Sequence, residues 1–205
     1  MSATESSAQG PEGQLVVADV TAWRAWLDTH EETSDGVWLH LAKKGTREPT
    51  TLTYAQALEE ALCSGWIDGQ KRSFDAATFL QRFTPRRRAS MWSARNVGII
   101  AELDAAGRIR PRGHAEVAAA RADGRWDRAY AGSADARVPA ELAAALADIA
   151  GATATFEGLS AAARYSILHP VITAPNPKTL AARIERAVEK IRVEMNAEEP
   201  QTERE

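Results

Sequence analysis

The sequence predicts an α+β fold: a predominantly helical single domain that carries a small antiparallel sheet of about three strands. Apolar residues repeat at helical spacing over much of the chain, and residues 36–44, 66–72 and 78–84 have the composition of short strands. The 205 residues are 44% hydrophobic and 26% charged, which is a globular composition and is sufficient for one ordinary core.

Two helices are expected in the first part of the chain. Asp19 is a suitable N-cap for a helix whose apolar side contains Trp23 and Trp26. Thr53 and Gln56 have the spacing of a capping box at the start of a second helix. Because both helices have an apolar face, we expect them to pack against the core.

Residues 66–72 and 78–84 are expected to form an antiparallel hairpin around a turn at 73–76. Side chains alternate between the two faces of a regular strand. Alternation places these residues on one face of the first hairpin strand: Trp66, Asp68, Gln70 and Arg72.

Helices are expected to dominate the remainder of the chain. One should begin at Ser90 and carry Asn96 on its apolar face, where a buried amide must be hydrogen-bonded. Others are expected at 112–123, 139–150 and 160–168, the last interrupted or kinked by Pro170. A final helix should have Asn176 as its N-cap, followed by proline at the first helical position.

The ordered domain is expected at residues 14–196, between a disordered tail at 1–13 and a disordered acidic tail at 197–205. The N-terminus has no secretory signal, and no uncharged run is long enough to cross a bilayer. The single cysteine cannot form an internal disulfide, and the histidines lack metal-ligand spacing. We therefore expect a cytoplasmic protein without a metal, a cofactor or a membrane span.

Positive charge is concentrated in one segment of a mildly acidic chain. Residues 70–95 contain seven basic residues and Asp75 as their only acid, so this segment carries +6 and the remainder −9. Tryptophan and phenylalanine are interleaved with the basic residues. Such a segment is typical of a surface that attracts anions.

Several motifs resemble one known family. They are Trp26-Leu27, Gly36 to Leu39 with Lys43-Lys44, Ala61 to Gly69, Arg82 to Arg86 and Ser90 to Asn96. In this order they are similar to motifs of the bacteriocin-protection or OmpD-associated (YdeI-like) proteins, and the resemblance extends to Arg183-Ile184. It implies a role in stress response or antimicrobial-peptide resistance, and no established reaction. Near the C-terminus, two basic positions of the family pattern are missing around Ala174 and Pro177.

A ligand pocket is expected between the hairpin and the helix from Ser90. Its candidate residues are Trp66, Asp68, Lys71, Arg72, Arg82, Arg86, Ser90, Trp92, Ser93 and Asn96. Most have a structural alternative: an ion pair of Asp68 with Arg72 or Arg82, a helix cap at Ser90, and aromatic packing in the core. Cys63 is expected to be a small buried residue and not a nucleophile.

The expected function is non-enzymatic protection that depends on binding an anionic small molecule or an acidic protein segment. Two alternatives remain open. One is a cofactor-independent enzyme with Asp68 as general acid or base and Arg86 as anion clamp. The other is weak, non-specific nucleic-acid binding; no motif for sequence-specific binding is present.

Overall fold

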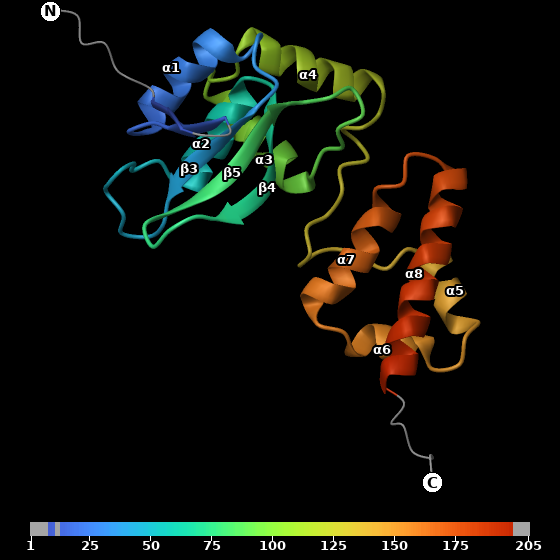
Figure 1. Cartoon of the computed structure of the whole chain (residues 1–205). Coiled ribbons are helices and arrows are strands. Elements are labelled where there is room, and N and C mark those ends of the chain that lie inside the picture. The colour runs from blue at the N-terminus through green and yellow to red at the C-terminus, as the bar shows by residue number, and fades with distance from the viewer. Residues whose placement is uncertain (1–7, 11–12, 199–205) are drawn as a thin grey trace, which may run out of the picture. The chain divides into compact units, whose positions relative to one another are not determined.

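The structure, a computed structural model, describes residues 8–10 and 13–198 (Figure 1). The chain divides into two compact units: unit 1 runs to Trp92 and includes Asn96–Arg128, and unit 2 comprises Ser93–Arg95 and the residues from Ala129. The sequence predicted one domain over 14–196. The structure differs because the residues after Ala129 form a separate hydrophobic core of their own.

Unit 1 combines one sheet with helices. The strands are β1 (Ala8–Gly10), β2 (Gln14–Val16), β3 (Val37–Ala42), β4 (Trp66–Ser73) and β5 (Thr78–Pro85). The helices are α1 (Val20–His30), α2 (Tyr54–Cys63), α4 (Pro111–Ala122) and all but the first two residues of α3 (Ala94–Ala105). The predicted α+β class is thereby confirmed.

The sheet of the described residues has five strands, in the order β1-β2-β3-β5-β4, and not about three. The hairpin and β3 are as predicted, but β1 and β2 extend the sheet, and β2 pairs with β3 in parallel. These two strands have three residues each, too few to show an alternating pattern.

An irregularity in β4 decides which residues share a face. Asp68 pairs with Phe83 and Lys71 pairs with Gln81, so β4 advances three residues while β5 advances two. This is the signature of a β-bulge, which transfers the following residues to the opposite face. Asp68 and Arg72 therefore lie on opposite faces, and the predicted regular alternation through Arg72 is wrong.

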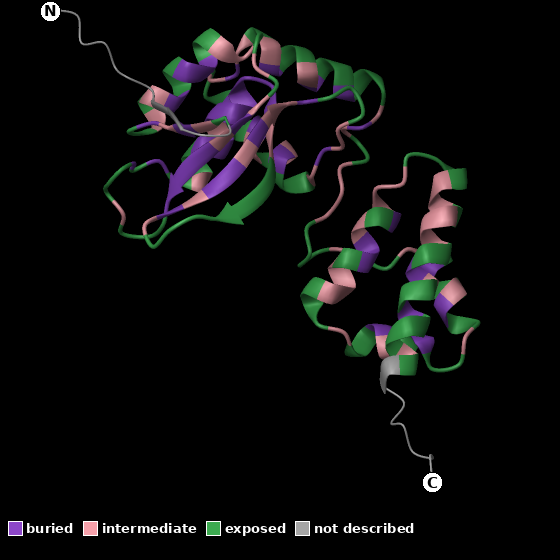
Figure 2. Cartoon of the chain, in the orientation of Figure 1, coloured by how far each residue is buried: buried purple, intermediate pink, exposed green. Residues whose placement is uncertain are grey.

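The core of unit 1 lies between the sheet and the helices (Figure 2). Trp23 of α1 packs edge-on against Trp66 of β4 and also contacts Phe83 of β5, and all three side chains are fully buried. The predicted caps hold α1 and α2 in place: Asp19 accepts from two backbone N–H groups, and Thr53 and Gln56 form the capping box.

Unit 2 contains four helices among its described residues. They are α5 (Ala140–Ala147), α6 (Ala152–Gly158), α7 (Ala161–Ile172) and α8 (Pro177–Glu198). Their core is mostly aliphatic, as with Leu142, Ile167 and Ile191. The predicted N-cap of α8 is confirmed, since Asn176 Oδ1 accepts from Thr179 N at 2.8 Å. Helix α6 was not predicted, and α7 continues through Pro170 to Ile172.

The predicted tails differ at both ends of the described chain. Ala8–Gly10 forms a strand and α8 continues to Glu198. The remaining positions of the two predicted disordered tails, 1–7, 11–12 and 199–205, lie outside the described residues. Within the described ranges, no helix combines the length and the apolar character needed to span a membrane.

Candidate functional site

Asp68 lies on the helix-covered side of the sheet, because it pairs with the buried Phe83 before the β-bulge. Its Oδ2 accepts a hydrogen bond of 2.8 Å from the Tyr54 hydroxyl at the start of α2. Arg72 and Arg82 lie on the other face, over the indole of Trp38, at 4.1 and 6.0 Å from its ring. The possible ion pair of Asp68 with either arginine is absent from the described part of the chain.

Arg86 and Trp92 are interior residues and not surface clamps. Arg86 is only 5% exposed, its guanidinium lies 3.4 Å from the Trp92 ring centre, and its Nη1 donates to Met91 O. Trp92 packs in turn on Trp126, with 4.9 Å between the rings. The stacked arginine stabilises the loop that follows β5.

Ser90 caps no helix, because α3 begins at Ala94. Its hydroxyl accepts from Arg87 N at 3.0 Å within a turn, and its carbonyl accepts from Arg125 at 2.9 Å. The predicted start of a helix at Ser90 is therefore wrong. Ser93 is bridged to Tyr130 and belongs to unit 2.

The other candidates are distributed through unit 1. Trp66 is fully buried and its Nε1 donates to Glu31 O, which makes it a core residue. Asn96 is buried within α3, as its apolar surroundings predicted. Lys71 is exposed and lies 4.4 Å from the centre of the Phe79 ring. Taken together, the ten candidates occupy a core, a loop and both sheet faces.

A charged cluster around Glu60 was not predicted. This glutamate of α2 is 1% exposed and its carboxylate binds Arg24, Arg108 and Arg110 at 2.5 to 3.1 Å. Burial alone would raise its pKa, but the hydrogen bonds and charges of the arginines lower it to about 2. The partners of Glu60 are distant in sequence, so only the fold brings them together.

Cys63 lies beside this cluster and is buried. Burial raises the pKa of its thiol to about 11, with the Glu60 carboxylate contributing in the same direction. A thiol in this state is a poor nucleophile, which agrees with the prediction. Histidine, cysteine, aspartate and glutamate side chains nowhere form a metal-binding group of three among the described residues.

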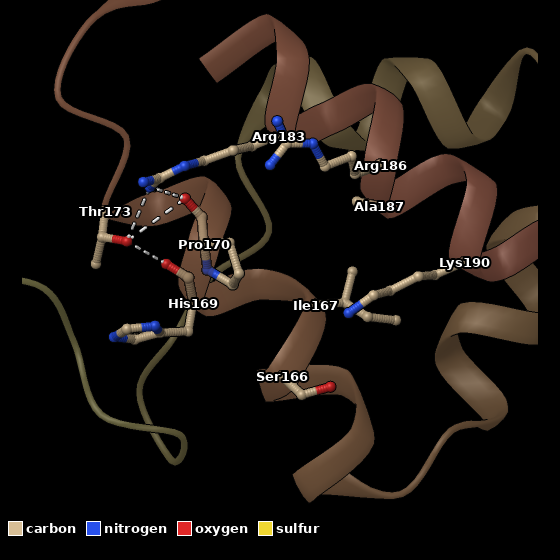
Figure 3. A pocket seen from close by; sticks show the side chains of 9 residues that line it. All are labelled: Ser166, Ile167, His169, Pro170, Thr173, Arg183, Arg186, Ala187 and Lys190. Atoms are coloured by element: carbon tan, nitrogen blue, oxygen red, sulfur yellow. Dashed lines mark hydrogen bonds between the residues drawn. The ribbon is translucent and has the colours of Figure 1, made fainter. Parts of the chain in front are cut away.

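A pocket of about 440 Å³ opens between α7 and α8 of unit 2 (Figure 3). It is lined by Ser166, Ile167, His169, Pro170, Thr173, Arg183, Arg186, Ala187 and Lys190. The pocket therefore has three cationic side chains, all from α8, and hydroxyl groups from α7, and no carboxylate lines it.

One cation of this pocket, Arg183, is hydrogen-bonded to neutral groups. Arg183 donates to Pro170 O at 2.5 Å and to Thr173 Oγ1 at 3.2 Å. No salt bridge of the described residues involves Arg183, Arg186 or Lys190. In Figure 3, the Lys190 side chain extends from α8 toward Ile167. Positive charge is thus concentrated in the pocket, while Glu189 lines an adjoining cavity with Arg186 and Lys190.

His169 adds a titratable group to the same wall. Its ring packs against Tyr130 and Tyr165, with ring centres 4.9 and 5.6 Å away. Burial lowers its pKa, and the charge of Arg183 lowers it further. The imidazole is therefore kept neutral near neutral pH, and an anion in the pocket would favour its protonation.

Two family models match the chain, on different units. Residues 15–116 match a domain of unknown function (DUF8412). Residues 135–193 match the model described as bacteriocin-protection, YdeI or OmpD-associated. The C-terminal part of the chain is therefore similar to this family. Neither the comparison with curated proteins nor the comparison with solved structures found a match.

The resemblance to the bacteriocin-protection family that the sequence predicted is thereby confirmed, but only over the C-terminal part of the chain. Most of the motifs that suggested it lie before Asn96, whereas the matched segment is the helical unit 2. All nine residues that line the α7–α8 pocket fall within 135–193. Arg183, Arg186 and Lys190 are spaced i, i+3 and i+7 on one helix, a signal that could have located the pocket.

Proposed function

We propose that this protein acts in bacteriocin protection by binding an anionic group in the α7–α8 pocket. The ligand chemistry is a phosphate or carboxylate, carried by a small molecule or by an acidic protein segment. One observation supports this choice: three cations and two hydroxyl-bearing side chains line a pocket that has no acidic residue. The pocket also lies within the segment that matches the bacteriocin-protection family.

The chemistry of the pocket favours an anion for two reasons. Arg186 and Lys190 are one helical turn apart, so their charges repel each other until an anion neutralises them. Hydrogen bonds from guanidinium and ammonium groups to an anion are stronger than those between neutral partners. The Ser166 and Thr173 hydroxyls on the α7 side already donate to the backbone carbonyls of Ala163 and His169, so the cations of α8 are the donors for an anion.

Calorimetric titration with sulfate, pyrophosphate and hexaglutamate tests the proposal. We expect at least one of these anions to bind the wild type. Combined Arg186→Ala and Lys190→Ala substitution should weaken binding about ten-fold or more, because charged hydrogen bonds contribute about 1.5–3 kcal/mol each.

Arg192→Ala is the matched control. It removes one charge from the same helix, but Arg192 is exposed and faces Glu189 at 3.7 Å. Its affinity should remain within about two-fold of the wild type. Absence of binding by all three anions, or equal loss in Arg192→Ala, would reject the α7–α8 pocket as the site.

The protective role is tested separately in a bacteriocin-sensitive bacterium. Expression of the wild type should raise survival under bacteriocin, and the Arg186→Ala and Lys190→Ala variant should not. Protection that persists without anion binding would retain the role and reject the pocket. Anion binding without any protection would retain the pocket and reject the protective role.

A further inference from the structure

The sheet of unit 1 has a second face that carries chemistry of its own. Residues paired across neighbouring strands share a face. Trp38 pairs with Arg82, and both His40 and Arg72 pair with Leu80, so these side chains lie on one face. This is the face opposite Phe83, and we call it the Trp38 face. Arg72 is exposed, and Trp38 and Arg82 are partly exposed, so the face reaches solvent.

The Trp38 face combines cations with aromatic rings. Arg72 lies 4.1 Å from the Trp38 ring centre and Arg82 lies 6.0 Å from it. Phe74, which follows β4, is 52% exposed and packs edge-on against His40 at 4.5 Å. From β2 to β5, the paired side chains on this face include no aspartate or glutamate. The nearby carboxylate of Asp75, in the turn between β4 and β5, accepts from the Thr78 hydroxyl beside His40.

We propose that the Trp38 face binds single-stranded nucleic acid without sequence preference. A base would stack on the Trp38 indole, and Arg72 and Arg82 would bind flanking phosphates. The exchange is favourable because stacking a base on an aromatic ring is worth more than an exposed cation–π contact. Arg72 then leaves the indole for a phosphate, with which it forms a charge-assisted hydrogen bond.

An acidic peptide fits this face less well than a nucleic acid. Glutamate side chains would satisfy the two arginines but would leave Trp38 and the exposed Phe74 without a stacking partner. A single strand supplies both a regular row of charges and planar rings. The two aromatic groups thus favour the nucleic acid over other polyanions.

Fluorescence anisotropy with a labelled twelve-nucleotide oligothymidylate tests this proposal on the full chain. Trp38→Ala should weaken binding about ten-fold, whereas Trp38→Phe, which keeps a ring, should stay within about three-fold of the wild type. Replacing Arg72 and Arg82 together by alanine should make the salt dependence shallower. The negative slope of log affinity against log salt should lose about 1.4 of its magnitude, the value for two phosphates on a single strand.

Unit 1 provides a matched control elsewhere on its surface. Arg121 of α4 lies 5.1 Å from the ring of Trp126, so Arg121→Ala also removes an arginine from an indole. This variant should bind like the wild type. Circular dichroism establishes whether each variant folds. If Trp38→Ala does not fold, the proposal is tested by the double arginine variant and by Trp38→Phe.

Several results would overturn the proposal. One is that the wild type does not bind the oligothymidylate at low salt. Others are that a duplex of the same length binds as tightly as the single strand, or that hexaglutamate competes as well as unlabelled oligothymidylate. The last is that Arg121→Ala loses as much affinity as Trp38→Ala. Each would show that stacking on Trp38 makes no contribution. Because the α7–α8 pocket is not involved, failure here leaves the proposed function of unit 2 unaffected.

Discussion

Unit 1 and unit 2 both contain arginines in partly buried positions, but these arginines have different partners. In unit 1, Glu60 is bound by three arginines and Arg86 is stacked on Trp92. In unit 2, three cations of α8 line a pocket that has no carboxylate. The difference teaches that positive charge which is dense along a sequence can be used inside the fold, as with Arg86. We propose that a pocket whose lining cations face no carboxylate is a better indication of an anion site.

The largest expected effect concerns the Glu60 cluster of unit 1. Glu60→Gln removes the charge that compensates Arg24, Arg108 and Arg110. The free energy of unfolding should fall by about 3 kcal/mol. This is the lower end of the range for breaking a buried ion pair, because the arginines reach solvent. All six tryptophans lie in unit 1, so tryptophan fluorescence in a denaturant titration measures this unit alone.

The acid dependence of the same signal provides the control. A carboxylate whose pKa is lowered to about 2 contributes stability that is present above about pH 4.5 and is lost as the pH falls toward 2. Glu60→Gln should remove most of this dependence, and sulfate binding by unit 2 should be unchanged. A variant as stable as the wild type would show that the cluster is not structural.

A smaller effect is expected where α4 packs on the end of α2. A Cβ on Gly113 would lie 2.3 Å from the carbonyl oxygen of Cys63, a backbone atom that cannot move aside cheaply. Gly113→Ala should therefore destabilise unit 1 by about 2 kcal/mol in the same fluorescence assay.

Gly158 at the end of α6 is the matched position in unit 2, because nothing lies within 4 Å of its added Cβ. Gly158→Ala should be neutral or slightly stabilising, by up to about 1 kcal/mol, because alanine favours the helix. Circular dichroism at 222 nm reports the helices of both units, so the unfolding of unit 2 is measured as the part of this signal that tryptophan fluorescence does not follow. Equal destabilisation by the two substitutions would contradict the packing described for α2 and α4.

The smallest expected effect is the pH dependence of sulfate binding in unit 2. A bound anion raises the pKa of His169 relative to the free protein, in which burial and Arg183 lower it. Affinity should therefore rise by a few-fold as the pH falls from about 7 to about 5, a range in which sulfate itself does not titrate. His169→Gln should give a flat profile in the same calorimetric titration. Affinity that rises with pH would exclude His169 from the pocket chemistry.

Local signals in the sequence predicted much of the fold. The caps at Asp19, Thr53 and Asn176 and the hairpin of β4 and β5 depend on neighbouring residues, and all are confirmed. The short elements β1, β2 and α6 were not predicted, since three to seven residues carry too little periodicity.

The candidate site was harder to predict because it depends on long-range geometry. The bulge between Asp68 and Lys71 moves Arg72 to the other face, and its sequence signal was overlooked: Gly69 lies within it, and an isolated glycine in a strand often marks a bulge. The arginines of Glu60 come from positions 36 to 50 residues away. In contrast, the cations of α8 share one helix, so their helical spacing was available in the sequence.

Residue-resolved NMR titration with pyrophosphate tests the central claim most directly, because it reports on both units in one experiment. The account predicts saturable shifts at Ser166, His169, Arg183, Arg186 and Lys190, with Arg86 and Trp92 unaffected. Saturable shifts at Arg86 and Trp92, with none along α7 and α8, would contradict it and return the anion site to the basic segment of unit 1.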